Sequence, residues 1–126
     1  MKKEVIHPPG VARGIVPHSL GMVFGDLIFC SGQFGLDPET GKLVAGGIGP
    51  ETRQCCENLK RILDAADASL DNSLKATIFM ADVSELMEMN EVFNEYFPAE
   101  PPVRTTNAVQ GHVHGARVQI ELIAHR

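Results

Sequence analysis

An arginine near the start of a short segment rich in β-branched residues is the side chain best suited to ligand chemistry. The segment reads Pro101-Pro102-Val103-Arg104-Thr105-Thr106-Asn107-Ala108-Val109. The two prolines end whatever precedes them, and the residues that follow favour a strand. Alternation along that strand places Arg104, Thr106 and Ala108 on one face. A guanidinium held there is a planar fork for a carboxylate or phosphate, and the ordinary alternative is a solvated surface arginine.

Two other segments combine glycine with polar side chains. Ser31-Gly32-Gln33 follows an apolar run, and its glycine either lets the backbone approach a ligand or permits a β-bulge. Between Gly111 and Gly115 stand His112 and His114, a His-x-His pair that could be half of a metal site. No third ligand is indicated and the flanking glycines predict a loop, so we expect neither a metal nor a cofactor.

The composition narrows the class of protein. The 126 residues carry a formal net charge of −5, and no run of Lys or Arg is longer than Lys2-Lys3, so we do not expect a nucleic-acid partner. A local basic pocket is still compatible with this charge, and Arg104 with Arg117 could form one. Three cysteines without a C-x-x-C pair indicate reduced thiols. With no recognisable signal peptide or bilayer-length apolar run, we expect a cytoplasmic protein without membrane association.

Periodicity predicts the order β-β-β-α-β-α-β-β in one domain of 126 residues. We expect strands at 4–7, 19–23, 27–30, 74–80, from 103 onward and at 116–124, and helices at 50–66 and from 82 to just before 98. The run from Leu27 to Cys30 is continuously apolar, as in a strand buried on both faces. Leu74 is expected to face the core with Ala76, Ile78 and Met80.

The helix patterns make three further predictions. Cys55 and Cys56 lie on or beside the apolar stripe of the first helix, so we expect structural rather than redox-active thiols. Asp82 followed by Glu85 resembles a capping box at the start of the second helix. Asn90 shares the apolar stripe of that helix, and a buried amide there is expected to hold a neighbouring loop rather than a substrate.

Two helices of moderate length can cover only one face of such a sheet. The other face is expected to carry Phe79 and Ile123 among polar residues, including Gln119 and Glu121 on the last strand. Packing of sheet faces in a homo-oligomer is the simplest way to cover it, and a pocket would then lie between subunits.

Seven segments together resemble the Rid family of reactive-intermediate deaminases, also called the YjgF family. They stand in family order across Pro17 to Ala124 and read Phe29-Cys30-Ser31-Gly32-Gln33, Leu36-Asp37-Pro38-Glu39-Thr40-Gly41-Lys42-Leu43, Gln54 to Leu63 with Asn58-Leu59, Leu74-Lys75-Ala76-Thr77-Ile78-Phe79, Asn90-Glu91-Val92-Phe93, Pro102-Val103-Arg104 and Ile120-Glu121-Leu122-Ile123-Ala124. The resemblance implies a chorismate-mutase-like α+β fold, a mixed sheet with two helices on one face, assembled as a homotrimer.

The same resemblance implies hydrolysis of 2-imino or 2-enamino acids to 2-oxo acids and ammonia, without a cofactor. The substrate-carboxylate arginine of the family falls on Arg104, and Ser31-Gly32 matches its pocket segment. A planar fork that holds the carboxylate also fixes where water attacks the C=N carbon. On this reading the catalytic candidates are Arg104, Gln119 and His18, and the substrate-binding candidates are Arg104, Ser31, Gly32, Thr106, Asn90 and Glu121.

Three positions depart from the family pattern. Gln119 stands where the archetypal deaminases carry a glutamate thought to handle the attacking water, and a carboxamide cannot transfer a proton at neutral pH. Val16-Pro17-His18 replaces a segment with tyrosine, and Thr106 replaces a cysteine that many members carry. The carboxylate-binding half of the site is therefore kept and the proton-handling half is altered.

Two hypotheses follow for function. The first is an imine or enamine deaminase in which His18 or Glu121 takes over part of the proton transfer, since imidazoles titrate near neutral pH. His18 could equally be a loop histidine with a satisfied hydrogen bond, and Glu121 a charge at the rim. The second is a non-catalytic trimer that binds small carboxylic acids as a sensor or partner-binding module. A different enamine, such as an aminomuconate-type substrate, is a third possibility. Ribonuclease activity, also claimed for parts of the family, fits poorly with the acidic charge.

Overall fold

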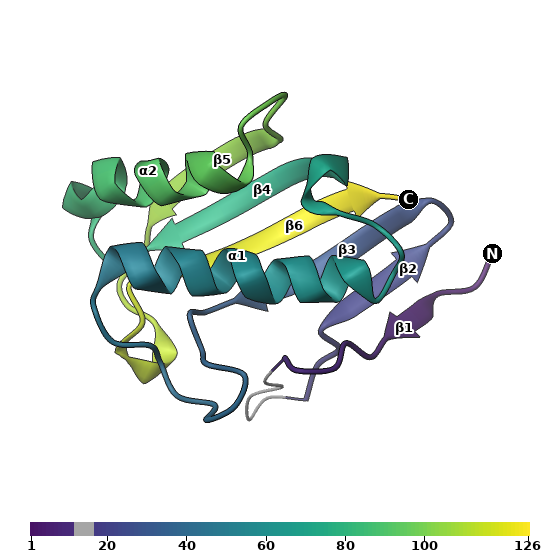
Figure 1. Ribbon diagram of the computed structural model, residues 1–126, viewed down its shortest axis with the longest axis horizontal. Helices are drawn as coiled ribbons and strands as arrows, with labels where there is room; N and C mark the ends of the chain where they lie inside the picture. The colour runs from purple at the N-terminus through teal and green to yellow at the C-terminus, as the bar shows by residue number, and fades with distance from the viewer. Residues whose placement is uncertain (12–16) are drawn as a thin grey trace.

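A computed structural model describes residues 1–11 and 17–126, which form one mixed sheet with two helices (Figure 1). The strands are β1 Glu4–Ile6, β2 Gly21–Phe24, β3 Leu27–Gln33, β4 Ser73–Met80, β5 Val103–Ala108 and β6 Val118–His125, and the helices are α1 Ile48–Asp64 and α2 Leu86–Tyr96. Their spatial order is β1-β2-β3-β6-β4-β5, antiparallel except for the parallel pair β4–β5. The predicted α+β order is confirmed.

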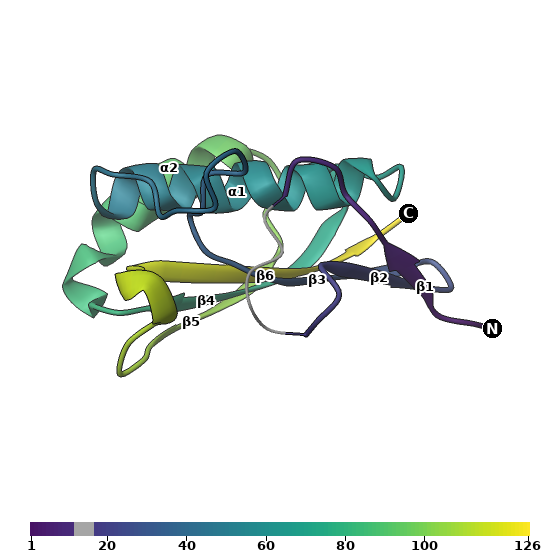
Figure 2. The ribbon, with the colours of Figure 1, turned by 90° about the horizontal axis from the view of Figure 1, so that it is seen from below.

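Both helices lie on the same face of the sheet, and none of the described residues forms an α-helix on the opposite face (Figure 2). The predicted stripe of α1, including both Cys55 and Cys56, is fully buried against β3 and β6. Alternate residues of the central strands complete this core: Ile28, Cys30, Ala76, Ile78, Met80, Val118, Ile120, Leu122 and Ala124. Strand alternation therefore explains which face the helices cover.

The starts of the two helices differ from the predictions. Helix α1 begins at Ile48 instead of Pro50, because Gly47 adopts a left-handed φ of 91° that turns the chain into the helix. Asp82 caps a 3₁₀ turn, η2 (Val83–Glu85), by accepting a hydrogen bond from the backbone N–H of Ser84 at 2.9 Å. The predicted capping box is therefore wrong for α2: its N-cap position is Glu85, whose side chain pairs with Arg117.

Two predictions of buried strand residues are also wrong for the single chain. Leu27 and Phe29 are 40% and 41% exposed, because the face of β3 on which they lie has no helix above it. Leu74 is 44% exposed because a register shift between Ser73 and Lys75 turns it outward and buries Ser73 instead. Both differences leave apolar side chains on the uncovered side, which we call the open face.

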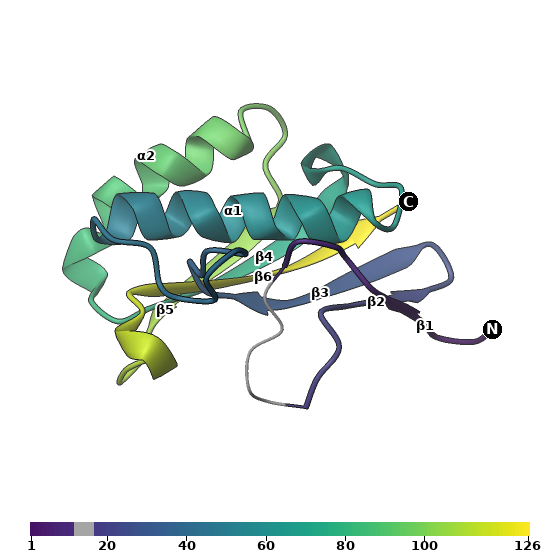
Figure 3. The same ribbon diagram turned by 60° about the horizontal axis from the view of Figure 1, so that its bottom comes forward.

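The segment that follows β1, up to residue 11, runs beside α1 (Figure 3). Arg61 of α1 donates a hydrogen bond to the Gly10 carbonyl at 2.6 Å, which ties this segment to the helix layer. None of the helices within the described ranges is long and apolar enough to cross a membrane.

Candidate functional site

Arg104 lies on β5 at the edge of the sheet, on the side that the helices cover. Its Cα partner on β4 is Ala76, a core residue, so the predicted face is confirmed. The guanidinium donates from Nη2 to Asn90 Oδ1 at 2.7 Å and from Nε to Thr106 Oγ1 at 2.9 Å, and its carbon lies 5.1 Å from the centre of the Phe93 ring. These contacts fix the orientation of the fork on three sides.

Asn90 therefore holds a strand residue, and the prediction that it holds a neighbouring loop is wrong. Its amide is half-buried at the edge of the α2 stripe, where the Arg104 side chain reaches it across the helix–sheet interface. Desolvation under α2 lowers the pKa of Arg104 from its ordinary value, but a guanidinium remains charged in proteins. We call Arg104, Asn90, Thr106 and Phe93 the clamp.

Ser31 and Gly32 form a β-bulge at the end of β3. The pairing of β3 with β6 shifts between Cys30 and Gln33, which confirms the bulge reading of this glycine. Gly32 also packs against Gln119: a Cβ at this position would lie 2.6 Å from Gln119 Nε2. Glycine thus permits the close approach of the β3 backbone to the carboxamide.

The open face beside this bulge is hollowed. A depression of about 450 Å³ is lined by Ser19, Met22, Phe29, Ser31, Lys75 and Glu121 among others. Gln119 pairs with Phe79 and Glu121 with Thr77, so both side chains lie on the same face of β6, as predicted. His18 is half-buried and precedes Ser19 in the loop before β2, whereas Val16 of the same motif lies outside the described residues.

One chain does not bring the two groups of candidates together. The clamp lies on the helix side at the β5 edge, while Ser31, Gly32, Gln119 and Glu121 gather on the open face of β3 and β6. A ligand held by Arg104 of one chain therefore cannot also lie in the hollow of the same chain.

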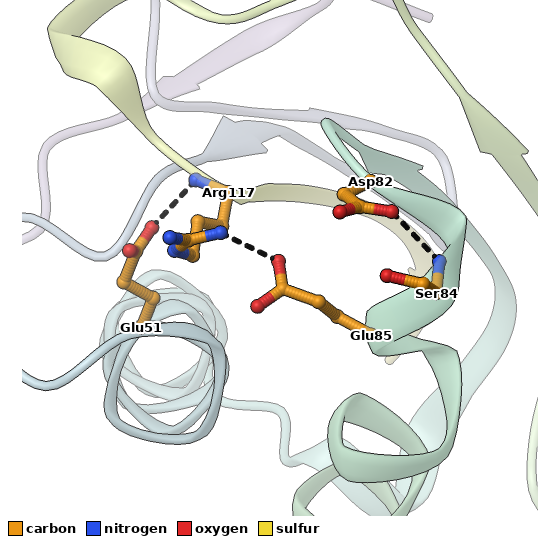
Figure 4. Close-up of polar contacts among 5 residues, drawn as sticks. All are labelled: Glu51, Asp82, Ser84, Glu85 and Arg117. Carbon is orange, nitrogen blue, oxygen red and sulfur yellow. Dashed lines mark hydrogen bonds and ion pairs between the residues drawn. The ribbon is translucent and has the colours of Figure 1, made fainter.

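Arg117 does not join Arg104 in a basic pocket, and that prediction is wrong. Its guanidinium pairs with Glu85 at 2.9 Å, and its backbone N–H donates to Glu51 Oε1 at 2.8 Å (Figure 4). Glu51 is 3% exposed, and desolvation raises the pKa of its carboxyl group. The sequence carried no signal for this buried acid, because a glutamate in the first turn of a helix ordinarily lies in solvent.

His112 and His114 lie in the loop that joins β5 to β6, and the predicted loop is confirmed. The short 3₁₀ turn η3 (Val113–Gly115) places both rings edge-on against Phe34, with centroids 5.3 and 6.1 Å away. Residues 1–11 and 17–126 contain no group of three or more His, Cys, Asp or Glu side chains placed to hold a metal ion.

The three thiols are buried, and none lies beside the clamp. Burial raises the pKa of Cys30 and of Cys56 to about 12, and that of Cys55 well above its ordinary value. Cys55 Sγ lies 3.1 Å from the Gln33 carbonyl, which accepts its hydrogen bond. Thiolate chemistry is therefore suppressed at all three, in agreement with the prediction of structural cysteines.

Comparison with known proteins finds relatives that agree on one family. Residues 11–126 match the model of the family described as Endoribonuclease L-PSP. A RutC family protein of Pyrococcus abyssi is 37% identical over 126 residues, 100% of this chain and 99% of that protein. The human protein named 2-iminobutanoate/2-iminopropanoate deaminase is 34% identical over 122 residues, which cover 97% of this chain and 89% of that one.

Solved structures agree with the sequence relatives. A Rid family protein of unknown function from Yersinia pestis has a TM-score of 0.95 at 32% identity, with 99% of this chain and 100% of that chain covered. TdcF of E. coli, solved with bound serine, has a TM-score of 0.92 at 30% identity, with 98% of each chain covered. With both the sequence match and the fold in agreement, this chain belongs to the endoribonuclease L-PSP family, the family of the YjgF, Rid and RutC proteins.

Proposed function

We propose that this protein hydrolyses reactive 2-imino or 2-enamino acids to 2-oxo acids and ammonia. The observation that carries the proposal is the orientation of Arg104, whose Nε and Nη2 are held by Thr106 and Asn90. Contacts within the described residues leave the Nη1 donors and the second Nη2 hydrogen for a ligand, and a carboxylate matches that edge of the fork. Several relatives are named for deamination of 2-iminobutanoate and 2-iminopropanoate, and TdcF was solved with serine, a small carboxylate.

The reaction depends mainly on holding the substrate and a water molecule in the correct relative position. Once the carboxylate is held, the adjacent C=N carbon has a defined location, and water adds to it to give a carbinolamine that expels ammonia. The Gln119 carboxamide can orient that water by hydrogen bonds, and the backbone at Ser31-Gly32 can orient the substrate. The clamp therefore binds the carboxylate, and Ser31, Gly32 and Gln119 on the open face, which we call the open-face group, orient the substrate and the attacking water.

The separation of these groups on opposite sides of the sheet supports a site shared between subunits of a homotrimer. In that arrangement Arg104 of one protomer faces Gly32 and Gln119 of its partner. The exposed apolar residues of the open face, among them Phe29 and Leu27, would be buried by the same assembly.

The first experiment is a coupled assay with matched arginine variants. An amino-acid oxidase or a threonine dehydratase generates the imine in place, and release of the 2-oxo acid is followed with and without this protein. Acceleration that is lost in Arg104→Ala and kept in Arg53→Ala is expected, because Arg53 pairs with Glu95 on the helix surface. Absence of acceleration across several imines would overturn the proposal.

Subunit mixing tests the shared site. Arg104→Ala breaks the clamp, and Gly32→Val breaks the open-face group, so each homo-oligomer should be inactive. Every mixed trimer contains one interface in which both halves are intact, and statistical mixing restores up to about a quarter of the wild-type sites. A mixture as inactive as its components would place the whole site in one chain.

Gln119 favours a second candidate function, a non-catalytic binder of 2-oxo acids or related carboxylates. A carboxamide binds water but cannot accept its proton. Two results together would support this function: the wild type shows no turnover, and a Gln119→Glu variant gains large turnover while its affinity for 2-oxobutanoate is unchanged.

A further inference from the structure

The His112-Val113-His114 segment has no role in the proposed reaction, yet His112 contacts Phe79, the β4 residue paired with Gln119. It belongs to the loop between the strand of the clamp, β5, and the strand of Gln119, β6. Imidazole is the side chain that most readily exchanges protons near neutral pH, and proton exchange is what Gln119 lacks.

Contacts with β4 and with the residue after β3 bring His112 to the part of the sheet where Gln119 lies. Its Nε2 lies 2.9 Å from the carbonyl oxygen of Phe79, and Phe79 is the Cα partner of Gln119 in the β4–β6 pair. On the other side, its ring packs against Phe34, which follows the bulge where Gly32 touches the Gln119 amide. His112 thus contacts the β4 residue that is paired with Gln119, and a ring two residues after the glycine that packs against the Gln119 amide.

The Phe79 carbonyl also selects the tautomer. A carbonyl oxygen only accepts hydrogen bonds, so Nε2 carries its hydrogen in both the neutral and the charged ring. The proton that comes and goes is therefore the one on Nδ1. A backbone carbonyl that fixes one ring nitrogen leaves the other as a defined proton acceptor.

The charged and titratable groups that face His112 are few. Glu51 of α1 lies near enough for its carboxylate and the imidazole to attract each other, and Arg117 and Glu85 adjoin Glu51. His114 shares the Phe34 ring from within the loop, at a left-handed φ of 64°. Among the described residues, the contacts from Phe34 and from β4 are a phenyl ring and a carbonyl, which do not titrate.

We propose that His112 is a catalytic residue of the deaminase, in which Nδ1 handles the proton that Gln119 cannot. As water adds to the substrate C=N carbon, Nδ1 takes a proton from it, and the resulting imidazolium returns a proton to the nitrogen of the carbinolamine. The hydroxyl group of the carbinolamine then gives its proton through Nδ1 to the departing nitrogen as the C–N bond breaks, so that ammonia leaves and the C=O bond forms. The proposal rests on the proposed function and assigns its acid/base group to the His-x-His loop.

The test compares two identical substitutions in one loop. His112→Gln keeps an amide N–H donor for the Phe79 carbonyl but does not titrate, and His114→Gln makes the same change on the same Phe34 ring. We expect His112→Gln to lose about 100-fold in kcat and the limb of the pH–rate profile that reports its protonation. His114→Gln should keep both, and 2-oxobutanoate affinity should be unchanged in each.

The outcomes separate this proposal from the proposed function. Full turnover and an unchanged pH profile in His112→Gln, with activity lost in Arg104→Ala, would overturn the role of His112 and leave the deaminase intact. A wild type that accelerates no imine would overturn both. If His112→Gln does not fold, the ¹⁵N shift of Nδ1 in the wild type decides: its titration should move when 2-oxobutanoate saturates the protein, and an unmoved titration would overturn the proposal.

Discussion

The clamp and the open face differ in how completely a single chain supplies their contacts. At the clamp, Arg104 has a hydrogen-bond acceptor on α2, another on its own strand and an aromatic ring beneath it. On the open face, Phe29 and Leu27 lie exposed around a hollow. The clamp is preorganised within one chain, whereas the open face leaves apolar side chains exposed to solvent.

A charged substitution on the open face should have the largest effect on assembly and turnover. Phe29→Asp places a charge where an apolar ring is 41% exposed, and burial of an unpaired charge in an interface is costly. If the proposed trimer buries this face, we expect a smaller mass in light scattering and a loss of turnover of roughly 100-fold or more. Met87→Asp is the matched control, since Met87 is 75% exposed on α2 and lies outside the hollow, and it should change neither.

Changes at Asn90 should sharpen the role of the clamp. Asn90→Asp puts a carboxylate on the Arg104 guanidinium, where it competes with the substrate, so we expect about 10- to 100-fold weaker binding of 2-oxobutanoate by calorimetry. Asn90→Ala only removes one hydrogen bond from the Arg104 guanidinium, so it should weaken 2-oxobutanoate binding less than Asn90→Asp does. Equal affinities in the two variants would contradict the view that Asn90 orients the arginine for a carboxylate.

Gly32→Ala tests the contact between the bulge and Gln119. The added methyl meets the Gln119 amide, which must move, while the clamp on β5 is untouched. We expect kcat to fall about 10-fold with ligand affinity within about 2-fold. A fall in affinity with unchanged kcat would instead place Gly32 in binding.

The buried acid at the α1–β6 junction gives a stability effect with a definite sign. Burial raises the pKa of Glu51, so the native state holds its proton to higher pH than the unfolded chain does. Stability is therefore full below the ordinary value of 4.5 and falls as pH rises through the native pKa. Glu51→Gln keeps an acceptor for the Arg117 N–H and should be more stable than the wild type at neutral pH, with the difference vanishing in acid. A constant difference in melting temperature across pH would contradict this.

Thiol reagents should have the smallest effect. All three cysteines are buried, and burial raises the pKa of Cys30 and Cys56 to about 12 and that of Cys55 well above its ordinary value, so the native protein presents no thiolate. We expect an aromatic disulfide reagent to leave turnover unchanged and to react with the thiols only after unfolding. Fast labelling of the native protein with loss of activity would show an accessible cysteine near the site.

Local patterns predicted the fold more reliably than they predicted burial. The element order, the α1 stripe and the alternation of β6 depend on neighbours in the chain, and all are confirmed. The errors at Leu27, Phe29 and Leu74 share one cause. Apolar composition states what a residue prefers, but whether another layer covers it depends on the number of helices and on one register shift.

The sequence by itself determined the elements, the face of β5 that carries Arg104 and the family resemblance, because strand alternation and motif order are properties of the chain. Only the tertiary structure decided the partners: Asn90 on Arg104, Glu85 rather than Arg104 beside Arg117, and the Phe79 carbonyl on His112. Each of these contacts joins elements more than ten residues apart. Their geometry follows from how α2, β5 and β6 pack in space, which no local pattern encodes.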